Sequence, residues 1–219
     1  MRECRIVSRK FGTEKNHTLS VAREQGGYSA VEAAFGLGGE AVVELIKASG
    51  LRGKGGGGAP AGSKWELMPR DSDKPSYLAV NADESEPGTF KDREIITKDP
   101  HLLIEGIIIT AYAIGAHDAY IYIRGEYYPF QKILQAAIDE AYAAGIVGQN
   151  VMGQDYRLDI TVHRGAGAYI CGEKSAMLES MEGKRGLPRL KPHHKEPEWY
   201  FGNPTLVNNV ETIATVPFI

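Results

Sequence analysis

The chain has 219 residues, a formal net charge of −3 and 42% hydrophobic residues, which is the composition of a globular protein that can bury a core without disulfides. Its 25 basic and 28 acidic residues nearly cancel and form no long single-sign block. This balance argues against nucleic acid or an anionic membrane surface as the main partner. Cys4 and Cys171 lie far apart, and His193 and His194 have no supporting cluster, so we expect neither a disulfide framework nor a metal or iron–sulfur site in the chain.

Two features bear on location. The most apolar stretch, residues 102–116, carries Glu105 and is shorter than the roughly 20 residues that cross a bilayer. The N-terminus is basic but has no apolar core behind it, unlike a secretory signal. We therefore expect a cytoplasmic protein without a membrane span.

The first 25 residues are polar and aperiodic, which predicts an N-terminal arm over 1–25 that either packs on a partner or stays loose. Order is expected to begin near Gly26, and residues 26–219 are expected to form one domain. Within it, apolar residues recur at spacings of three and four over 28–35 and 40–48, which predicts two short amphipathic helices.

Strand and helix patterns then alternate along the chain. Asp99 before Pro100 is typical of a helix start, and the following residues continue as an almost wholly apolar helix. The alternation predicts an α/β protein with parallel strands joined by crossovers, whose ligand binds beyond the carboxyl ends of the strands. After Gly183 we expect an irregular wrap over the surface and then a new helix following Asn208-Asn209. The predicted strands are 76–81, 119–124 and 157–163, and the predicted helices are 102–114, 129–144 and 173–181.

A glycine-rich segment follows the second predicted helix. Gly53-Lys-Gly-Gly-Gly-Gly58 satisfies G-x-G-x-x-G, but a helix precedes it, so a Rossmann dinucleotide fingerprint is rejected. Backbone without side chains can still cradle a phosphate or a flat ring system, and Lys64 could reach an anion. The alternative is a flexible loop.

Two further segments carry ligand-binding groups. Asn81-Ala-Asp-Glu-Ser-Glu-Pro-Gly88 places carboxylates and an amide at the end of a strand, where they can bond ribityl or ribose hydroxyls. A solvated turn with helix-capping acids is the alternative for this segment. Residues 165–173 form a second glycine-rich turn from strand to helix, whose amides could hold an anion. Two such loops after predicted strands favour a nucleotide or flavin site.

Taken together, five motifs resemble the NADH-oxidising flavoprotein subunit of respiratory complex I, NADH:quinone oxidoreductase. Related diaphorase subunits of hydrogenases and formate dehydrogenases carry the same domain. The order and spacing of the motifs match over about residues 26–219. The motifs are Gly50-Leu-Arg-Gly-Lys-Gly-Gly, Asn81-Ala-Asp-Glu-Ser-Glu-Pro-Gly-Thr-Phe-Lys-Asp-Arg93, Arg124-Gly-Glu-Tyr127, Arg164-Gly-Ala-Gly-Ala-Tyr-Ile-Cys-Gly-Glu173 and Asn208-Asn-Val-Glu-Thr212.

The resemblance implies an α/β domain of modified Rossmann type, with a parallel sheet and flanking helices, that binds FMN and NADH. NADH would stack on FMN and pass it a hydride, so no residue needs to act as a general acid or base. By motif, the residues carried over as cofactor-binding are Gly53, Gly55, Gly56 and Lys64 along the cleft; Asn81, Asp83 and Glu84 on the flavin; Glu86 on the nicotinamide nucleotide; Gly172, Glu173, Asn208 and Asn209 on the flavin and phosphate side; and Tyr169 and Lys174 near them.

Three positions depart from the family pattern. Ala59 and Leu67 stand where the family has aromatic residues that resemble adenine-stacking groups, and Lys174 stands where it has a glutamate. Because a lysine attracts a 2′-phosphate that a carboxylate repels, Lys174 keeps an NADPH-preferring diaphorase subunit as an alternative function. The missing aromatics leave open a structural FMN-binding subunit that has lost nucleotide oxidation.

The family continues into a ubiquitin-like domain and an iron–sulfur domain, which these 219 residues do not include. Electrons would therefore pass singly to iron–sulfur clusters on a further segment or another chain, and on to quinone or another acceptor. The implied partners are a thioredoxin-like 2Fe-2S subunit and 4Fe-4S subunits of an assembly like complex I or a hydrogenase. Such a subunit could be peripheral to the inner face of a membrane through those partners.

Overall fold

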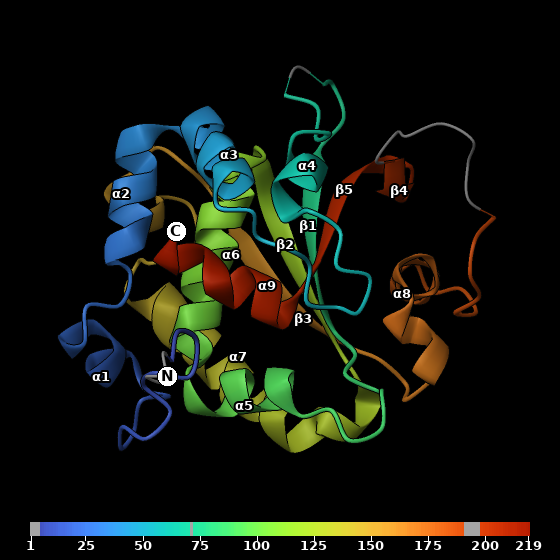
Figure 1. The fold of residues 1–219 in the computed structure, drawn as a ribbon, viewed down its shortest axis with the longest axis horizontal. Coiled ribbons are helices and arrows are strands. Elements are labelled where there is room, and N and C mark those ends of the chain that lie inside the picture. The colour runs from blue at the N-terminus through green and yellow to red at the C-terminus, as the bar shows by residue number, and fades with distance from the viewer. Residues whose placement is uncertain (1–4, 71, 191–197) are drawn as a thin grey trace.

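The computed structural model describes residues 5–70, 72–190 and 198–219, so Cys4, His193 and His194 lie outside the described residues. A five-stranded sheet in the order β3-β2-β1-β5-β4 forms its centre (Figure 1). β1 pairs in parallel with β2 and β5, and β2 pairs in parallel with β3, whereas β4 runs antiparallel to β5. The predicted parallel α/β sheet is thus confirmed. The strands are β1 (Ser76–Ala82), β2 (Ala116–Ile123), β3 (Asp159–Arg164), β4 (Glu198–Tyr200) and β5 (Asn203–Asn209).

Most helices cover one face of the sheet, on the left in Figure 1, and α8 covers the other. The larger core lies on the first side, and a smaller cluster that includes Met177 and Leu178 lies under α8. The α-helices are α1 (Leu19–Glu24), α2 (Ser29–Leu37), α3 (Gly39–Ala48), α4 (Ala61–Trp65), α5 (Lys91–Lys98), α6 (Pro100–Ala113), α7 (Tyr128–Ala143), α8 (Lys174–Met181) and α9 (Val210–Thr215). Short 3₁₀ helices span η1 (Gly125–Tyr127), η2 (Val151–Gly153), η3 (Tyr169–Gly172) and η4 (Val216–Phe218).

The buried helix α6 forms as its sequence predicts. The Asp99 side chain accepts a hydrogen bond from the Leu102 amide at 3.3 Å, and Pro100 occupies the first helical position. All but one of its 14 residues are buried, which agrees with its almost wholly apolar sequence. This helix packs against both the sheet and α9, so it is the central support of the larger core.

The strand order creates a switch point. From β1 the chain continues outward through β2 and β3, whereas β5 returns to the opposite side of β1. Asn81 and Asn209 are paired in register at the carboxyl ends of β1 and β5. In open α/β sheets the crevice outside such a reversal is the usual ligand site.

Two expectations are corrected here. Residues 183–219 are not simply an irregular wrap, because β5 is an interior strand of the sheet. Pro204 argues against a strand, but it is tolerated at the second position of β5, beside the short strand β4. The helices α4 and α5 were also not predicted, and α5 buries only Asp92, Ile95 and Ile96. The helix predicted after Asn209 is confirmed as α9.

Order does not begin near Gly26 either. Residues 19–24 form α1, and the segment before it packs on the domain itself. The buried Asn16 donates from Nδ2 to the Lys98 carbonyl at 3.0 Å, and the Leu19 amide donates to the Glu140 carboxylate at 2.6 Å. These contacts join chain positions far apart in sequence, so an aperiodic pattern could not reveal them.

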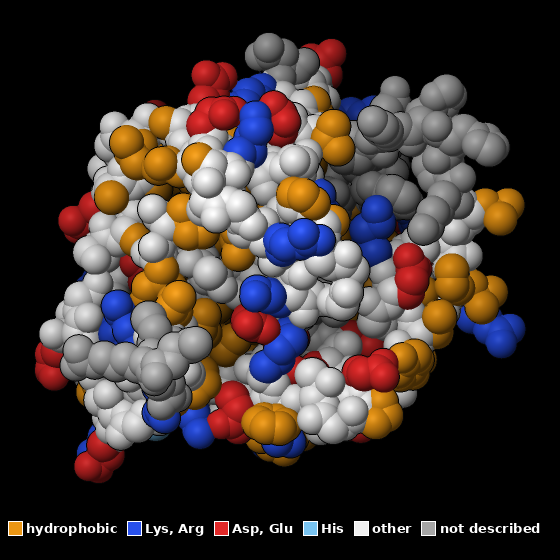
Figure 2. All heavy atoms as spheres, in the orientation of Figure 1, with side chains coloured by type: hydrophobic (Ala, Val, Ile, Leu, Met, Phe, Trp, Pro, Cys, Tyr) orange, Lys and Arg blue, Asp and Glu red, His pale blue; other side chains and the backbone are white. Residues whose placement is uncertain are grey.

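The visible surface agrees with the balanced composition. Figure 2 shows blue and red side chains interleaved along the middle of this face and orange ones gathered over α2 and α3. Leu37 and Leu45 are among the exposed apolar residues there. Within the described ranges, no helix combines the length and the apolar character that crossing a bilayer requires.

Candidate functional site

The first glycine loop is a closed turn rather than a flexible linker. Arg52 and Pro60 form an antiparallel bridge, the Gly53 amide donates to the Ala59 carbonyl at 2.8 Å, and Arg52 Nε donates to the Gly58 carbonyl at 2.7 Å. The amide of Gly53 is therefore used inside the turn. A φ of 102° at Gly56 is a left-handed conformation that favours glycine.

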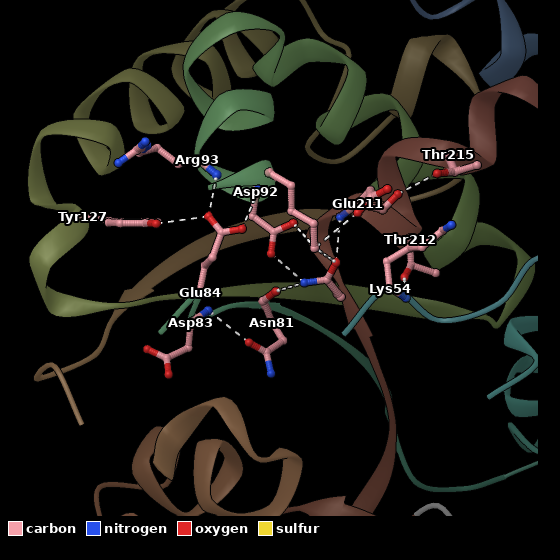
Figure 3. Close-up of polar contacts among 12 residues, drawn as sticks. Lys54, Asn81, Asp83, Glu84, Asp92, Arg93, Tyr127, Glu211, Thr212 and Thr215 are labelled. Atoms are coloured by element: carbon pink, nitrogen blue, oxygen red, sulfur yellow. Dashed lines mark hydrogen bonds and ion pairs between the residues drawn. The ribbon is translucent and has the colours of Figure 1, made fainter. Parts of the chain in front are cut away.

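The end of β1 holds a second set of groups. Asn81 donates from Nδ2 to the Gly172 carbonyl at 2.8 Å and accepts from the Asp83 amide at 3.0 Å (Figure 3). Asp83 also accepts from the Ser85 hydroxyl at 3.1 Å. Burial raises the pKa of the Asp83 carboxyl to about 6, although the Ser85 bond opposes the shift. The β1 exit thus presents a carboxyl group whose pKa is raised to about 6.

Glu84 has a structural use in this arrangement. Its carboxylate accepts hydrogen bonds from the amides of Asp92 at 2.9 Å and Arg93 at 3.0 Å, and from the Tyr127 hydroxyl at 3.0 Å (Figure 3). It therefore caps the start of α5 from the preceding loop. The Glu84 carbonyl accepts from Arg124 Nη1 at 2.7 Å, which ties the same loop to the end of β2.

A polar cluster connects α5 to the end of β5. Asn209 donates from Nδ2 to Asp92 at 2.6 Å and accepts through Oδ1 from Lys91 Nζ at 2.8 Å. Lys91 also pairs with Asp92 at 2.6 Å and with Glu211 at 3.4 Å. Burial raises the pKa of Asp92 to about 6, and the Lys91 ammonium opposes that shift. The Lys54 amide, from the glycine loop, bonds the Thr212 hydroxyl at 2.9 Å and brings that loop to the cluster.

The second glycine loop leads into α8 through Glu173. The Glu173 carboxylate accepts from the amides of Ser175 at 2.8 Å and Ala176 at 2.9 Å, so it caps the helix. Burial raises the pKa of Glu173, but the hydrogen bonds from the Ser175 hydroxyl and from these two amides outweigh burial and leave the pKa below its usual value. A β-carbon at Gly172 would lie 3.3 Å from Asp83 Oδ2, so a side chain there would crowd the end of β1.

These elements enclose a cavity of about 350 Å³ at the switch point. Its lining comes from the two glycine loops, the β1 exit, the start of α5 and the end of β5. Of the residues expected from the sequence, it brings together Gly55, Gly56, Asn81, Asp83, Glu84, Glu86, Gly172 and Asn209. It adds Lys54, Ser85, Thr89, Lys91 and Asp92, which were not singled out although they lie within the motifs from Gly50 and from Asn81 to Arg93.

Other expected residues lie outside that lining. Lys64 donates to the Val207 carbonyl at 2.8 Å, and burial, followed by repulsion from Lys174, lowers its pKa. Gly53 and Glu173 serve the turn and the helix cap described above. Tyr169 is 61% exposed and donates from its hydroxyl to Glu86.

Asn208 is also outside the lining. It is 3% exposed, and its Nδ2 has no hydrogen-bond partner among the described residues. Buried amide nitrogens are normally paired, so an unpaired one favours a group that the polypeptide does not supply.

The donor set of the cavity fits FMN. Asn81 and Asp83 can bond hydroxyl groups of a ribityl chain, and the amides of the first glycine loop with Lys54 can hold a phosphate. Gly55 and Gly172 have no side chain that would crowd the lining: a β-carbon at Gly55 would lie 3.4 Å from Asn209 Cβ, and one at Gly172 would lie 3.3 Å from Asp83 Oδ2. The two sides of the cavity thus suit different parts of one ligand.

Comparisons with known proteins agree with this geometry. A family model described as the Nuo51 FMN-binding domain matches residues 46–218. The chain is 53% identical over 216 residues to a subunit of the NADH-quinone oxidoreductase of Rhodobacter capsulatus, covering 98% of this chain and 50% of that protein. It is 55% identical over 203 residues to the corresponding subunit of Aquifex aeolicus, covering 93% of this chain and 47% of that protein.

A solved structure is similar as well. A chain of the NAD+-reducing [NiFe]-hydrogenase in the H2-reduced state matches with a TM-score of 0.79 and 39% identity, over 92% of this chain and 35% of that chain. The chain spans about half the length of the curated relatives it matches. The motifs, the cavity at the switch point and these likenesses agree, and the chain belongs to the Nuo51 FMN-binding domain family.

Proposed function

We propose that the chain binds FMN in the cavity at the switch point and takes part in the oxidation of NADH. The observation that carries the proposal is the convergence of four separate chain segments on that one cavity. The relatives named as subunits of NADH-quinone oxidoreductase and the NAD+-reducing hydrogenase support the choice of nucleotide.

The residues have distinct tasks in this proposal. Asn81 and Asp83 bond the hydroxyl-rich part of FMN, and Gly55, Gly56 and Lys54 supply the anion-binding side. Gly172 leaves the approach to the ring open, and Glu86 contacts the nicotinamide nucleotide. Bound FMN supplies a hydride acceptor that can release its electrons one at a time. The chain itself binds, orients and shields the reactants, so no side chain has to transfer a proton.

Glu84, Asp92 and Asn209, which also line the cavity, hold that arrangement in place. The Glu84 cap sets the start of α5, and the contact between Asn209 and Asp92 joins α5 to β5. Because these bonds are made before any ligand arrives, binding orders few additional groups.

The partners follow from where the electrons go. We propose that they leave to iron–sulfur clusters on another segment or chain, of which a thioredoxin-like 2Fe-2S subunit is one. The curated relatives are named as subunits of NADH-quinone oxidoreductase, which supports an assembly. We place the assembly in the cytoplasm, where it can be peripheral to the inner face of a membrane through its partners.

A second candidate is NADPH oxidation, favoured by one observation. Burial and then the positive charge of Lys174 lower the pKa of the Lys64 amine, so the two lysines lie close enough to repel each other. An added 2′-phosphate would relieve their repulsion. A structural FMN-binding role without nucleotide oxidation is the third outcome of the same experiment.

The test is reduction of the FMN-loaded chain without oxygen by NADH and by NADPH, in the parent and in Lys174→Glu. Bleaching of the flavin absorbance by NADH supports the main proposal. Faster bleaching by NADPH that is lost in Lys174→Glu supports the second, and no bleaching by either nucleotide leaves only the structural role.

A further inference from the structure

A buried histidine lies where four helices meet, outside the lining of the cavity. His101 is the second residue of α6 and is 2% exposed. Its Nδ1 lies 2.6 Å from the hydroxyl of Tyr28, which directly precedes α2, and its Nε2 lies 3.3 Å from the carboxylate of Glu140 in α7. The same carboxylate accepts a hydrogen bond from the amide of Leu19, the first residue of α1, at 2.6 Å. His101 and Glu140 thus join α6 and α7 to the residues that precede α2.

The two contacts of His101 determine where a neutral ring carries its hydrogen. A carboxylate only accepts hydrogen bonds, so the hydrogen of the neutral imidazole lies on Nε2 and points to Glu140. Nδ1 is then an acceptor, and the Tyr28 hydroxyl donates to it. Protonation of the ring adds a hydrogen to Nδ1 that faces the Tyr28 hydroxyl. The hydroxyl can then no longer donate to the ring, so protonation removes this hydrogen bond in its neutral form.

Tyr28 lies in a strained turn between α1 and α2. Its φ is 72°, and that of Gly26 is 78°; this left-handed conformation suits glycine but is unfavourable for a bulky side chain. The start of α2 is held to α6 by a hydrogen bond from the Ala30 amide to the Glu105 carboxylate at 3.1 Å. The hydrogen bond between the Tyr28 side chain and His101 helps to keep the strained turn against α6.

Charged groups on two sides act differently on a protonated His101 ring. We call residues 17–27, which hold α1, the α1 segment. Burial lowers the pKa of His101, and the hydrogen bond and negative charge of Glu140 oppose that shift. His17 and Arg23 lower the pKa further, because they repel a positive ring. Protonated His101 is therefore attracted to α7 and repelled by the α1 segment. The titratable and charged groups that face the His101–Tyr28 pair are His17 and Arg23 from the α1 segment, Glu140 from α7, and Asp99 and Glu105 from the start of α6.

We propose that His101 is a pH-operated switch that holds the α1 segment on the domain while its ring is neutral and releases that segment when the ring is protonated. Release breaks the bond between His101 and Tyr28 and lets the strained turn relax. The Glu140 carboxylate then pairs with the charged ring and gives up the Leu19 amide. The switch acts on the α1 segment and needs no bound nucleotide, so it goes beyond the proposed function.

The experiment measures hydrogen exchange of the α1 segment by mass spectrometry in the full chain between about pH 8 and pH 5, with rates corrected for the intrinsic effect of pH. The docked state holds fewer protons than the released state, because the pKa of His101 is lowered only in the docked state. Docking is therefore favoured above about pH 6.5, the ordinary pKa of a histidine, and is weakened as the pH falls below it. We expect exchange of the α1 segment to become at least about tenfold faster over that step, while β1 stays protected.

Two variants should move the midpoint of this step in opposite directions. Glu140→Gln removes the negative charge that favours the protonated ring, so the midpoint moves to lower pH by about half a unit or more. Tyr28→Phe removes the hydroxyl that opposes a hydrogen on Nδ1, so the midpoint moves to higher pH. His101→Gln abolishes the step, because its amide does not titrate in this range. His117→Gln is the matched control, since His117 is an exposed histidine that contacts the Arg157 carbonyl through Nδ1, and it should keep the midpoint of the parent.

Constant protection of the α1 segment across this pH range in the parent would overturn the switch. A step that persists in His101→Gln would also overturn it, as would shifts of the same sign in Glu140→Gln and Tyr28→Phe. If His101→Gln does not fold, the opposite shifts of the other two variants decide the question. Loss of protection in β1 at the same pH as in the α1 segment would mean that the whole domain unfolds, which contradicts a local switch.

Discussion

Asn209, at the end of β5, donates a hydrogen bond to the buried carboxylate of Asp92 in α5 at 2.6 Å. This contact joins two elements that the sequence places 117 residues apart, and it forms the floor of the candidate FMN cavity. The neighbouring ammonium of Lys91 bonds both partners, so the three side chains act as one unit.

Replacing Asn209 therefore affects stability as well as binding. In Asn209→Ala the buried Asp92 loses a donor, and we expect unfolding in urea to require about 1 to 3 kcal/mol less free energy, together with weaker FMN binding. Asn203→Ala is the control, because Asn203 lies in the same strand but its side chain donates to the Tyr200 and Phe201 carbonyls and not to Asp92. Equal losses of FMN affinity in both variants would contradict a specific role of the Asn209–Asp92 hydrogen bond in FMN binding.

The two carboxyl groups with raised pKa values predict how stability changes with pH. Burial raises the pKa of both Asp83 and Asp92 to about 6, whereas an unfolded aspartate releases its proton near about pH 4. Between these pH values the folded chain holds more protons than the unfolded chain. The contribution of each group to stability is thus greatest at low pH and is lost as the pH rises to about 6.

Asp83→Asn isolates one of these groups. The variant should gain about 1 to 3 kcal/mol relative to the parent as the pH rises from about 4 to 6, with no further change above that window. Urea unfolding of the FMN-free chain at several pH values measures the difference. A constant difference across the window would show that the Asp83 pKa is not raised.

The second glycine loop offers a test of close approach. An alanine at Gly172 places its β-carbon 3.3 Å from Asp83 Oδ2, in the lining of the cavity, whereas one at Gly57 meets nothing within 4 Å. We expect Gly172→Ala to lower FMN affinity at least about tenfold and Gly57→Ala to leave it within about twofold. Fluorescence titration with FMN measures the affinity of each variant. Similar affinities in the two variants would show that the flavin does not lie against Gly172.

Helix packing predicts opposite effects for two helical glycines. A β-carbon at Gly106 would overlap the Ile213 carbonyl where α6 crosses α9, so Gly106→Ala should destabilise the fold by about 1 to 3 kcal/mol. Gly36 lies in α2 with open space around it, and Gly36→Ala should stabilise the fold by about 0.5 to 1 kcal/mol. Thermal unfolding distinguishes these signs, and a shift of the same sign in both variants would contradict the packing of α6 on α9.

Local signals were enough to predict much of the fold. The sequence alone identifies α6 and β1, because local residues mark where they begin: Asp99 and Pro100 start α6, and an apolar run forms β1. Helix α5 could not be found in this way, because its cap is Glu84, which reaches it from the preceding loop. Strand β5 was hidden by Pro204 and is a strand because β1 pairs with it.

The site shows the same division. Motif comparison identified Asn81, Asp83 and Gly172 in the cavity lining, because their local turns carry them there. It did not reveal that Glu173 caps α8 or that Lys64 bonds a strand carbonyl, since each depends on where a side chain finds a partner. It also passed over Asp92, whose burial follows from the packing of α5 against α6, α7 and α9 and from the contact with Asn209, and not from its neighbours in sequence.

A crystal structure of the chain grown with FMN measures most directly where the cofactor lies. The predicted result is flavin density in the cavity between Gly55 and Gly172, with Asp83 and Asn81 within hydrogen-bond distance of the ribityl hydroxyls. Flavin density at another place on the chain, with this cavity filled only by solvent, would contradict the assignment.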